Sequence, residues 1–389
     1  TNGLARTNLD TMRAELEANK SIAEWKNIGK REALRRKATA WATQRRRSSA
    51  FSIIDRSGTP AVSSSHSAQL LAEHWSEVFA DKPCLPSAQC GLLEHCVRAP
   101  DDIIWRLDID SFSQIAAKCT DSAPGPDGLP YSAWALADQR VLAVVHSAYC
   151  DLLNGVPLPD SFNISLMVLI PKGELDGDHI AIARTPGATR PITLSNSIAK
   201  LFAMCLNRGL STIAQTTVLP RQRGFVRGRN LIDNIIETEA FMLRSATWFD
   251  DKAGLLLLDF VAAFPSLAHR WILLVLRTMG IPVKVYRAIQ ALYQGCKVEL
   301  IYGNIDNLMF VVTAGIKQGC PASVSLFALA LDPFIRYLCL RLPKPIYLVT
   351  AFADDMAIAT RRLPGRLGAL LVLMDLRDAA ACLRLNLDK

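Results

Sequence analysis

Three aspartates that interrupt apolar segments are the side chains with the clearest chemical potential. Asp354 and Asp355 lie between two apolar runs in the segment 347–360, and Asp259 follows the run LLLL at 255–258. Charged side chains are rarely buried in a strand unless they are paired, so each of these aspartates requires an explanation. Successive strand residues point to opposite faces, and two adjacent carboxylates can therefore approach one site only at a bend. The alternative is a merely polar turn, because Asp is common in turns.

Asp259 supplies a third carboxylate from elsewhere in the chain. At the end of a buried strand, its charge costs free energy unless a cation or hydrogen-bond donors meet it. Roughly 95 residues separate Asp259 from Asp354, which is enough chain for the two strands to fold back and pair. Three converging carboxylates would suit two magnesium ions, which prefer oxygen ligands and promote in-line displacement at phosphorus when about 3.5–4 Å apart. The implied reaction class is nucleotidyl transfer.

Short strands and helices are expected to position these carboxylates. Strands are predicted at 255–260 and at 347–360, the latter as two strands meeting at a tight turn, with a further hairpin at 298–312 around Gly303 and Asn304. Apolar spacing predicts helices at 67–80, 271–279, 285–293, 323–340 and 366–385. Between 80 and about 234 the pattern alternates helices with turns, and Pro/Gly clusters punctuate it. This order predicts an α+β fold with a mostly antiparallel sheet.

Composition limits the class of protein. The chain has 389 residues, 50% of them hydrophobic, and a formal net charge of +8, which suits a polyanionic partner without proving one. The ten cysteines include no CxxC pair, and the loose group of Cys84, Cys90, His95 and Cys96 lacks a recognised zinc spacing. We therefore expect reduced thiols and an intracellular protein. No signal peptide and no uninterrupted apolar run of spanning length is visible, so no membrane partner is expected.

The first fifty residues have a pattern of their own. They are predicted to be helical, with a strongly basic second half from Lys26 to Arg47 in which Trp25 and Trp41 are interleaved. Such a helix could follow a nucleic-acid backbone by neutralising phosphates, or it could be a solvated face or a nuclear-import patch. Both interpretations remain open.

Seven motifs, taken in order, resemble those of reverse transcriptases of the non-LTR (LINE-like) retrotransposon type. They are APGPDGLP (123–130), LIPK (169–172), RPITL (190–194), QRGFVRGR (222–229), LLLLDFVAAF (255–264), GIKQGCPAS (315–323) and AFADD (351–355). Each is weak alone, but their order and spacing make the resemblance specific.

The resemblance implies the fingers and palm of a right-hand polymerase, with helices packed on an antiparallel palm sheet. A basic helical connector or N-terminal extension is expected at 1–85, a fingers-like region at 86–235 and a palm at 236–389. The reverse transcriptase domain is expected at about 123–389. Residues 383–389 (LRLNLDK) resemble the motif that follows the catalytic hairpin, so the thumb is expected to be absent from this chain.

By resemblance, Asp259, Asp354 and Asp355 are the catalytic palm carboxylates. Asp259 and Asp354 would be the main ligands of two Mg²⁺ ions, for which Mn²⁺ could substitute, and Asp355 would support the site. The backbone carbonyl of Phe260 would add an oxygen. Pro265 stands where many relatives carry a further aspartate, which is expected to change the local turn rather than the chemistry.

The same resemblance assigns residues to the substrates. Those expected to bind the incoming nucleotide are Lys172, Arg190, Phe260, Phe264, Gln318 and Gly319, and those expected to contact the template are Gly224, Phe225, Arg227 and Arg229. Lys172 and Arg190 would grip the triphosphate, for which Arg offers a planar fork and Lys a point charge. The Phe264 ring would collide with a ribose 2′-hydroxyl and so favour deoxynucleotides.

The predicted function is an RNA-directed DNA polymerase that extends a DNA primer on an RNA template with deoxynucleoside triphosphates, expected to act in the nucleus. One alternative is a catalytically incompetent, nucleic-acid-binding fragment of a retroelement. Another is a group II intron maturase-like reverse transcriptase. An RNA-dependent RNA polymerase shares the same carboxylate chemistry, but the fingers motifs match reverse transcriptases better. Template, insertion target, oligomeric state and protein partners cannot be predicted from the sequence.

Overall fold

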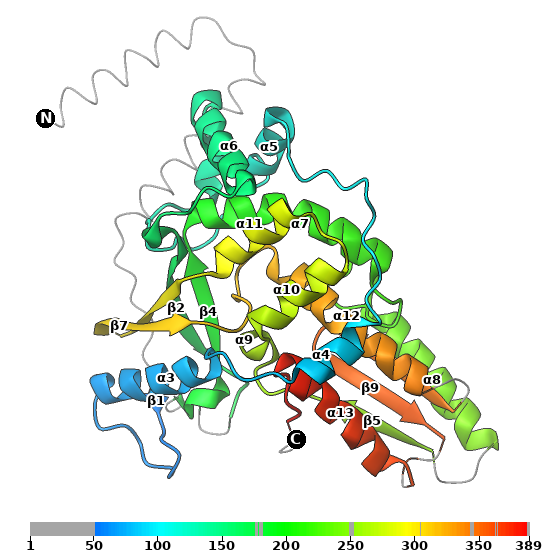
Figure 1. The fold of residues 1–389 in the computed structure, drawn as a ribbon. Coiled ribbons are helices and arrows are strands. Elements are labelled where there is room, and N and C mark those ends of the chain that lie inside the picture. The colour runs from blue at the N-terminus through cyan, green and yellow to red at the C-terminus, as the bar shows by residue number, and fades with distance from the viewer. Residues whose placement is uncertain are drawn as a thin grey trace, which may run out of the picture.

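A computed structural model describes residues 51–386 except 176–177, 179–181, 249–252, 304, 343–345, 362 and 364; the side chains of 305–307 are also left undescribed. The predicted basic N-terminal helix and Lys389 lie outside these residues. Two separate β-sheets are seen in Figure 1, one at the left around β2 and β4 and one at the lower right around β5 and β9. Helices α10 and α12 lie between them. The fold therefore mixes helices and sheets, as predicted.

A four-stranded sheet has the order β4-β2-β6-β7. Its strand β2 (Ile164–Pro171) pairs antiparallel with β4 (Thr189–Ser195) and parallel with β6 (Cys296–Tyr302). β6 forms an antiparallel hairpin with β7 (Ile305–Val312), which confirms the hairpin predicted at 298–312. A separate two-stranded parallel ribbon joins β1 (Ser52–Ile53) to β3 (Ala183–Arg184).

The prediction of only helices and turns between 80 and 234 is wrong, because β2 and β4 lie in that range. The run at 164–171 is apolar on both sides of the strand, and a short continuous apolar run does not distinguish a strand from a buried helix. The sheet also joins strands from the ranges assigned to the fingers-like region and to the palm, since β2 pairs with β6.

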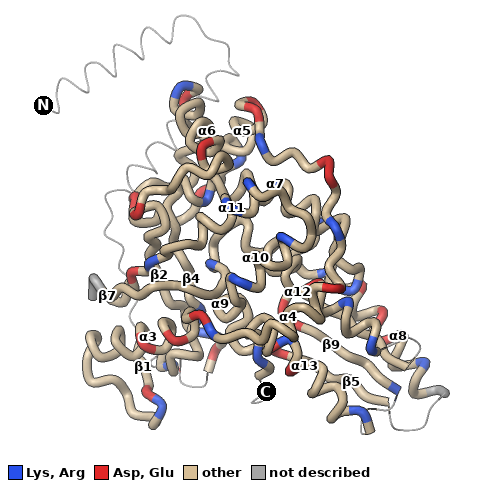
Figure 2. Tube along the Cα trace, viewed as in Figure 1, with Lys and Arg blue, Asp and Glu red and all other residues tan. Residues whose placement is uncertain are grey.

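The second sheet is antiparallel throughout and has the order β5-β9-β8. Its strands are β5 (Gly254–Leu258), β9 (Asp355–Thr360) and β8 (Tyr347–Phe352), which confirms the strands predicted at 255–260 and 347–360. One face is buried in the main core through residues such as Leu258 and Ile358. The other face leaves Leu257 72% exposed. Figure 2 draws β5 and β9 almost wholly in tan, because charged residues stand only near the ends of these strands.

Helices fill the space around the two sheets. Among the described helices, α12 (Ser323–Arg341) alone is long and apolar enough to cross a membrane, but 72% of its most apolar window is buried inside the fold, as in a core helix. α8 (Leu231–Trp248) lies over β8 and β9. The others are α3 (Ser64–Val78), α4 (Pro86–Leu93), α5 (Ile109–Ala116), α6 (Gln139–Asn154), α7 (Ser197–Thr217), α9 (Ala263–Ser266), α10 (His269–Thr278), α11 (Val283–Tyr293) and α13 (Leu367–Ala381). The predicted helices at 67–80, 271–279, 285–293 and 323–340 correspond to α3, α10, α11 and α12.

The helix predicted at 366–385 is too long at its C-terminal end. α13 ends at Ala381, and Cys382 adopts a left-handed conformation (φ 59°) that stops the helix. The following residues are extended, and Leu385 forms an antiparallel bridge with Phe260. This extended stretch, residues 383–386, therefore runs beside the end of β5.

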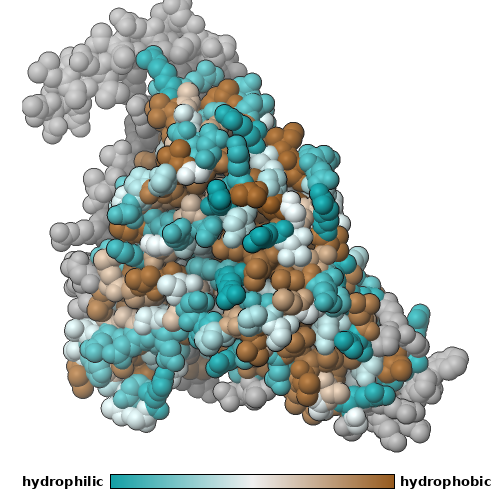
Figure 3. Space-filling model, in the orientation of Figure 1, coloured by the Kyte–Doolittle hydropathy of each residue, from teal (hydrophilic) through white to brown (hydrophobic). Residues whose placement is uncertain are grey.

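Two hydrophobic cores hold these parts together, and the smaller one packs α3 on β2, β6 and β7 through side chains such as Trp75, Met167 and Val298. The larger core is continuous. It reaches from α4 to residue 383 and includes side chains of α7, α10 and α12 together with one face of the β5-β9-β8 sheet. On the face of the molecule drawn in Figure 3, hydrophobic atoms also reach the surface at the lower right, around α13 and β5. Val372 of α13 is 68% exposed, and Leu257 of β5 is 72% exposed.

Candidate active site

The three aspartates meet where β5 ends beside the β8–β9 hairpin. Phe352 pairs with Asp355, so Ala353 and Asp354 form a two-residue turn at the hairpin tip. Leu258 pairs with Met356, and the next position along the ladder sets Asp259 beside Asp355. Ala353 adopts a left-handed conformation (φ 58°), which makes the tight bend possible. Carboxylates far apart in sequence thus converge at one end of the sheet.

Electrostatics supports the same proximity. Partial burial raises the pKa of Asp354 above its usual value, and the negative charges of Asp355 and Asp259 raise it further. Asp354 and Asp259 are half-buried, whereas Asp355 is exposed. Mutual repulsion of this kind makes the site favourable for a cation.

Asn386 holds Asp259 in place. Its side-chain amide donates to Oδ2 of Asp259 (3.0 Å), and its backbone N–H donates to the carbonyl of Asp259 (2.9 Å). Val261 N–H completes the attachment by donating to the carbonyl of Arg384 (3.0 Å). Sequence reasoning matched the motif LRLNLDK but missed this role, because a contact over 127 residues leaves no local pattern.

Gln222 holds the hairpin tip. It is fully buried, its Nε2 donates to the carbonyl of Ala353 (3.0 Å), and its Oε1 accepts from the N–H groups of Ala353 (2.9 Å) and Gly224 (2.8 Å). One neutral amide therefore satisfies both polar groups of the residue that precedes Asp354. The sequence assigned no role to Gln222, although it opens the motif QRGFVRGR.

Gly224, predicted to contact the template, packs against the same turn. A Cβ built on it would lie 1.9 Å from the backbone N of Ala353, a distance that no side chain could occupy. The residue is buried. Its neighbour Phe225 is 45% exposed, with a positive φ of 62°. Of this pair, only Phe225 presents a side chain to an outside partner.

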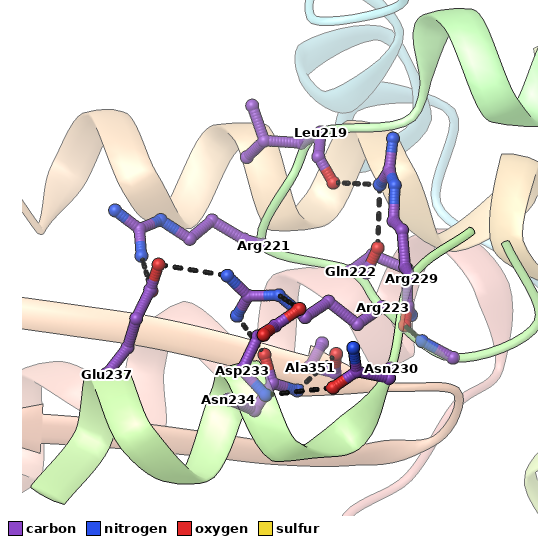
Figure 4. A network of polar contacts seen from close by, with 11 residues as sticks. Leu219, Arg221, Gln222, Arg223, Arg229, Asn230, Asp233, Asn234, Glu237 and Ala351 are labelled. Atoms are coloured by element: carbon purple, nitrogen blue, oxygen red, sulfur yellow. Dashed lines mark hydrogen bonds and ion pairs between the residues drawn. The ribbon is translucent and has the colours of Figure 1, made fainter. Parts of the chain in front are cut away.

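Charged contacts attach this segment to α8 and β8, as Figure 4 shows. Arg221 and Arg223 both form ion pairs with Glu237 of α8, the latter at 2.9 Å. Arg223 also donates to the side chain of Asn234, whose Nδ2 donates to the carbonyl of Ala351 (2.9 Å). Residues 221–224 are therefore attached to α8 and, through Asn234, to β8, next to the aspartates.

Arg229, predicted to contact the template, points into the fold. Its Nη1 donates to the carbonyls of Leu219 (2.8 Å) and Gln222 (2.7 Å), and its Nη2 donates to that of Val218 (2.8 Å) (Figure 4 draws the first two). These contacts satisfy carbonyl groups of the C-cap of α7 and of the connection that follows it. Arg227, by contrast, is exposed. Of the two arginines predicted to contact the template, Arg229 therefore has a structural role, whereas Arg227 has a side chain available for that contact.

The predicted sugar-contacting residue, Phe264, lies in an aromatic cluster. Its ring stacks on Phe327 of α12 (4.3 Å between centroids, 11° between planes), and Phe225 meets it edge-on (5.9 Å, 84°). The side chain of Phe264 is only half-buried. Phe260, next to Asp259, is 4% exposed and lies under the guanidinium of Arg377 at 4.0 Å. Stacking fixes the Phe264 ring while leaving part of it open.

The other predicted nucleotide residues gather at β4. The carbonyl of Gln318 accepts from Thr193 N–H (2.8 Å), and Gly319, at φ 116°, approaches so closely that a Cβ would lie 2.7 Å from the Thr193 carbonyl. Arg190 is exposed on the same strand and faces Ile170 of β2. Lys172, which follows the end of β2, is exposed, and its Nζ donates to the carbonyl of Gly187 (2.9 Å).

A groove lies beside the carboxylates. This cavity of about 880 Å³ runs between α8 and the exposed face of the β5-β9-β8 sheet. Asp259, Asp355 and Asn386 stand on its wall, which is otherwise largely apolar, with side chains such as Leu231 and Leu257. Asp259 and Asp355 are therefore accessible from a space large enough for part of a substrate.

The donor set suits metal ions that are bound together with a substrate. Within the described residues, no three or more His, Cys, Asp or Glu side chains gather closely enough to hold a metal by themselves. Mg²⁺ usually keeps several waters and takes one or two carboxylates plus substrate phosphates. The oxygen-only donors at Asp259 and Asp354, whose charges repel each other, fit that mode of binding.

Comparison with known proteins places this site in a family. The family model described as "Reverse transcriptase (RNA-dependent DNA polymerase)" matches residues 170–389, which include all three aspartates. The chain is 27% identical over 333 residues to the Drosophila melanogaster "Retrovirus-related Pol polyprotein from type-2 retrotransposable element R2DM", covering 83% of this chain and 29% of that protein.

Two further relatives agree. A Nasonia vitripennis "Retrovirus-related Pol polyprotein from type-1 retrotransposable element R2" is 27% identical over 66% of this chain and 24% of its own length. The Xenopus laevis "Transposon TX1 uncharacterized 149 kDa protein" is 25% identical over 74% of this chain and 22% of its own length. The chain thus spans less than a third of each of these relatives. The resemblance to non-LTR reverse transcriptases is confirmed, and the chain belongs to the reverse transcriptase (RNA-dependent DNA polymerase) family.

Proposed function

We propose that this protein extends a DNA primer on an RNA template with deoxynucleoside triphosphates, using Asp259, Asp354 and Asp355 as its catalytic carboxylates. The observation that carries the proposal is the convergence of β5 and the β8–β9 hairpin, which brings the three acidic side chains to one end of the sheet beside an open groove. A merely polar turn would not explain Asp259, which comes from a separate strand.

Reverse transcriptases use divalent metal ions such as Mg²⁺. In the proposed site Asp259 and Asp354 would hold two Mg²⁺ ions, with Mn²⁺ as a substitute, and Asp355 would support the charge balance. When bound, the metal ions would supply the Lewis-acid chemistry needed for nucleotidyl transfer. Asn386 and Gln222 keep the carboxylates oriented toward the groove, since each bonds the backbone at one of the two converging elements.

Residues of β2, β4 and α9 would bind the nucleotide. Arg190 of β4 and Lys172, just past the end of β2, are exposed cations on adjacent chain segments, and a triphosphate could meet both. Phe264, held by its stack on Phe327, would exclude a 2′-hydroxyl by its bulk. Gln318 and Gly319 lie against β4 and would present backbone and amide groups to the base pair that forms. Phe225 and Arg227 are the exposed candidates for template contact.

Primer extension tests the proposal. Purified protein with an RNA template, a DNA primer, deoxynucleotides and Mg²⁺ should extend the primer, and Asp354→Asn should lower the rate by more than about 100-fold, because even groups outside the ligand set are worth 10–100-fold. The matched control is Asp102→Asn, an exposed aspartate in the connection before α5, which should leave the rate unchanged.

Three results would count against the assignment. Equal extension by Asp354→Asn and wild type would show that the chemistry lies elsewhere. Tight binding of the primed template without extension by the wild type would favour the non-catalytic, nucleic-acid-binding alternative. Ribonucleotides incorporated in preference to deoxynucleotides would favour an RNA polymerase.

A further inference from the structure

Two cysteines that are far apart in sequence meet in this fold. The Sγ atoms of Cys84 and Cys382 lie 3.4 Å apart. Cys84 belongs to the connection between α3 and α4, and Cys382 is the residue that ends α13. Both sulfurs also lie 3.7 Å from the backbone carbonyl of Lys82. Among the described cysteines, this is the pair whose sulfur atoms are recorded in contact.

The contact is built into the packing of α4 on α13. Leu85 N–H donates to the carbonyl of Ala379 (2.7 Å), and the side chain of Gln89 donates to that of Ala380 (3.0 Å). These two donors satisfy carbonyls in the last turn of α13, which otherwise lack intrahelical partners. Because Gln89 is only 2% exposed, the start of α4 is fixed against the end of α13. The two thiols are therefore held as neighbours.

The two thiols differ in reactivity. The hydrogen bond from the Cys382 thiol lowers the pKa of Cys84, and the positive charge of Arg270 lowers it further. The hydrogen bond between the two sulfurs raises the pKa of Cys382, and burial raises it further. Cys84 is half-buried, whereas Cys382 is 6% exposed. Since the thiolate is the nucleophile, Cys84 is the sulfur that would react first with an oxidant from solvent.

We propose that Cys84 and Cys382 are an oxidation site that forms a reversible intramolecular disulfide when the protein meets hydrogen peroxide. The Cys84 thiolate attacks one peroxide oxygen, the O–O bond breaks and hydroxide leaves, which gives a sulfenic acid. The Cys382 sulfur then attacks the Cys84 sulfur, so that the S–S bond forms, the S–O bond breaks, and water leaves with the Cys382 proton. Peroxide is reduced to two waters and two thiols are oxidised to one disulfide.

The required movement is small. A disulfide has an S–S length of about 2.05 Å, so the sulfurs must approach by roughly 1.4 Å. Rotation of the two side chains would supply this approach, because the backbone segments that carry them are already held next to each other.

The location connects the site to the aspartates. Cys382 is followed by the segment 383–386, whose Arg384 and Asn386 bond the chain at 259–261. A covalent link at 382 would anchor the start of this segment to α4. The oxidised protein is therefore expected to resist thermal unfolding better than the reduced protein.

Peptide mapping of the full chain tests the proposal. After mild peroxide treatment and blocking of free thiols, non-reducing mass spectrometry should find one peptide pair that contains Cys84 and Cys382, with two hydrogens fewer than the separate peptides. Reductant should separate the pair. The variants Cys84→Ser and Cys382→Ser should each abolish it, whereas Cys90→Ser, which changes an exposed cysteine of α4, should not.

A thermal measurement gives a second readout. Peroxide should raise the Tm of the wild type and of Cys90→Ser by at least about 2 °C, and reductant should reverse the change. The proposal is overturned if Cys90 is oxidised while Cys84 and Cys382 remain unlinked, or if Cys84 links to another cysteine. Neither measurement depends on polymerase activity, so this result and that of the proposed function can be told apart.

Discussion

At the β5-β9-β8 sheet, the candidate carboxylates stand at strand ends whose backbone is held by side-chain amides, whereas at the β4-β2-β6-β7 sheet the candidate cations are exposed. Gln222 and Asn386 each bond the backbone beside an aspartate. Arg190 has no comparable support and is exposed.

The difference follows from what each site must bind. Ligands of a metal ion must keep their distances within about 0.2 Å, so the chain around them is held by directional hydrogen bonds. Long cationic side chains reach a phosphate from many positions, and a rigid strand is enough to present them. Substitutions of neighbouring residues should therefore lower activity more around the carboxylates than around the cations.

Among changes to residues other than the aspartates, removal of the amide that holds the hairpin tip should have the largest effect. Gln222→Ala leaves the N–H and carbonyl of Ala353 without partners and frees the turn that carries Asp354. We expect kcat for primer extension to fall by about 10–100-fold, the usual cost of losing a group that orients a ligand. Single-turnover extension measures it. Gln69→Ala, which changes an exposed glutamine of α3, is the control, and equal rates for both variants would remove Gln222 from the positioning role.

Loss of a cation on the other sheet should weaken substrate binding instead. Arg190→Ala is expected to raise KM for the deoxynucleotide by about 10-fold, since a charge-assisted hydrogen bond is worth roughly 1.5–3 kcal/mol. Steady-state kinetics with varied nucleotide measures the change. Arg190→Lys should recover part of the loss. Arg98→Ala, an exposed arginine before α5, should leave KM unchanged, and a fall in kcat alone for Arg190→Ala would contradict phosphate binding.

Arg227 and Arg229 separate template binding from stability. Arg229→Ala should lower Tm because the carbonyls of Val218, Leu219 and Gln222 lose a donor, while Arg227→Ala should leave Tm unchanged. Arg227→Ala should weaken binding to primed template by a few-fold and reduce its dependence on salt by about one phosphate contact. Thermal unfolding and binding at several salt concentrations measure both. A Tm for Arg227→Ala that is lower than the Tm for Arg229→Ala would contradict this distinction.

The smallest effect concerns charge repulsion at Asp354. Because its pKa is raised in the folded state, its contribution to stability is full below the unfolded pKa and is lost as pH rises through the folded pKa. Without metal, Asp354→Asn should therefore melt about 1–2 °C above wild type at pH 7, and the difference should vanish below about pH 4. Mg²⁺ should stabilise wild type more than the variant. A wild type that is the more stable protein at pH 7 without metal would show that repulsion is not significant.

Local patterns in the sequence carried the prediction of the carboxylates and their strands. Asp259 after LLLL and the pair Asp354-Asp355 between apolar runs interrupt the pattern at the positions where the structure brings the strands together. Strand β2 was missed because its apolar residues occur on both faces and leave no alternation. The end of α13 was placed too late because apolar residues continue past Cys382, and only its backbone conformation stops the helix.

The supporting residues could not be found from local patterns. Gln222 meets Ala353 across 131 residues, and Asn386 meets Asp259 across 127. The sequence also does not show where a guanidinium points, so Arg227 and Arg229 look alike although only Arg229 is directed into the fold. The assigned roles of the nucleotide and template residues remain predictions.

The close approach of Gly224 to the hairpin tip has a consequence for how this protein can vary. With 1.9 Å between its absent Cβ and the nitrogen of Ala353, any larger residue there must displace the turn that holds Asp354. A scan of all substitutions scored by extension should thus find position 224 as intolerant as the aspartates themselves. Loss of activity there would arise from displaced backbone rather than from a lost contact with the template.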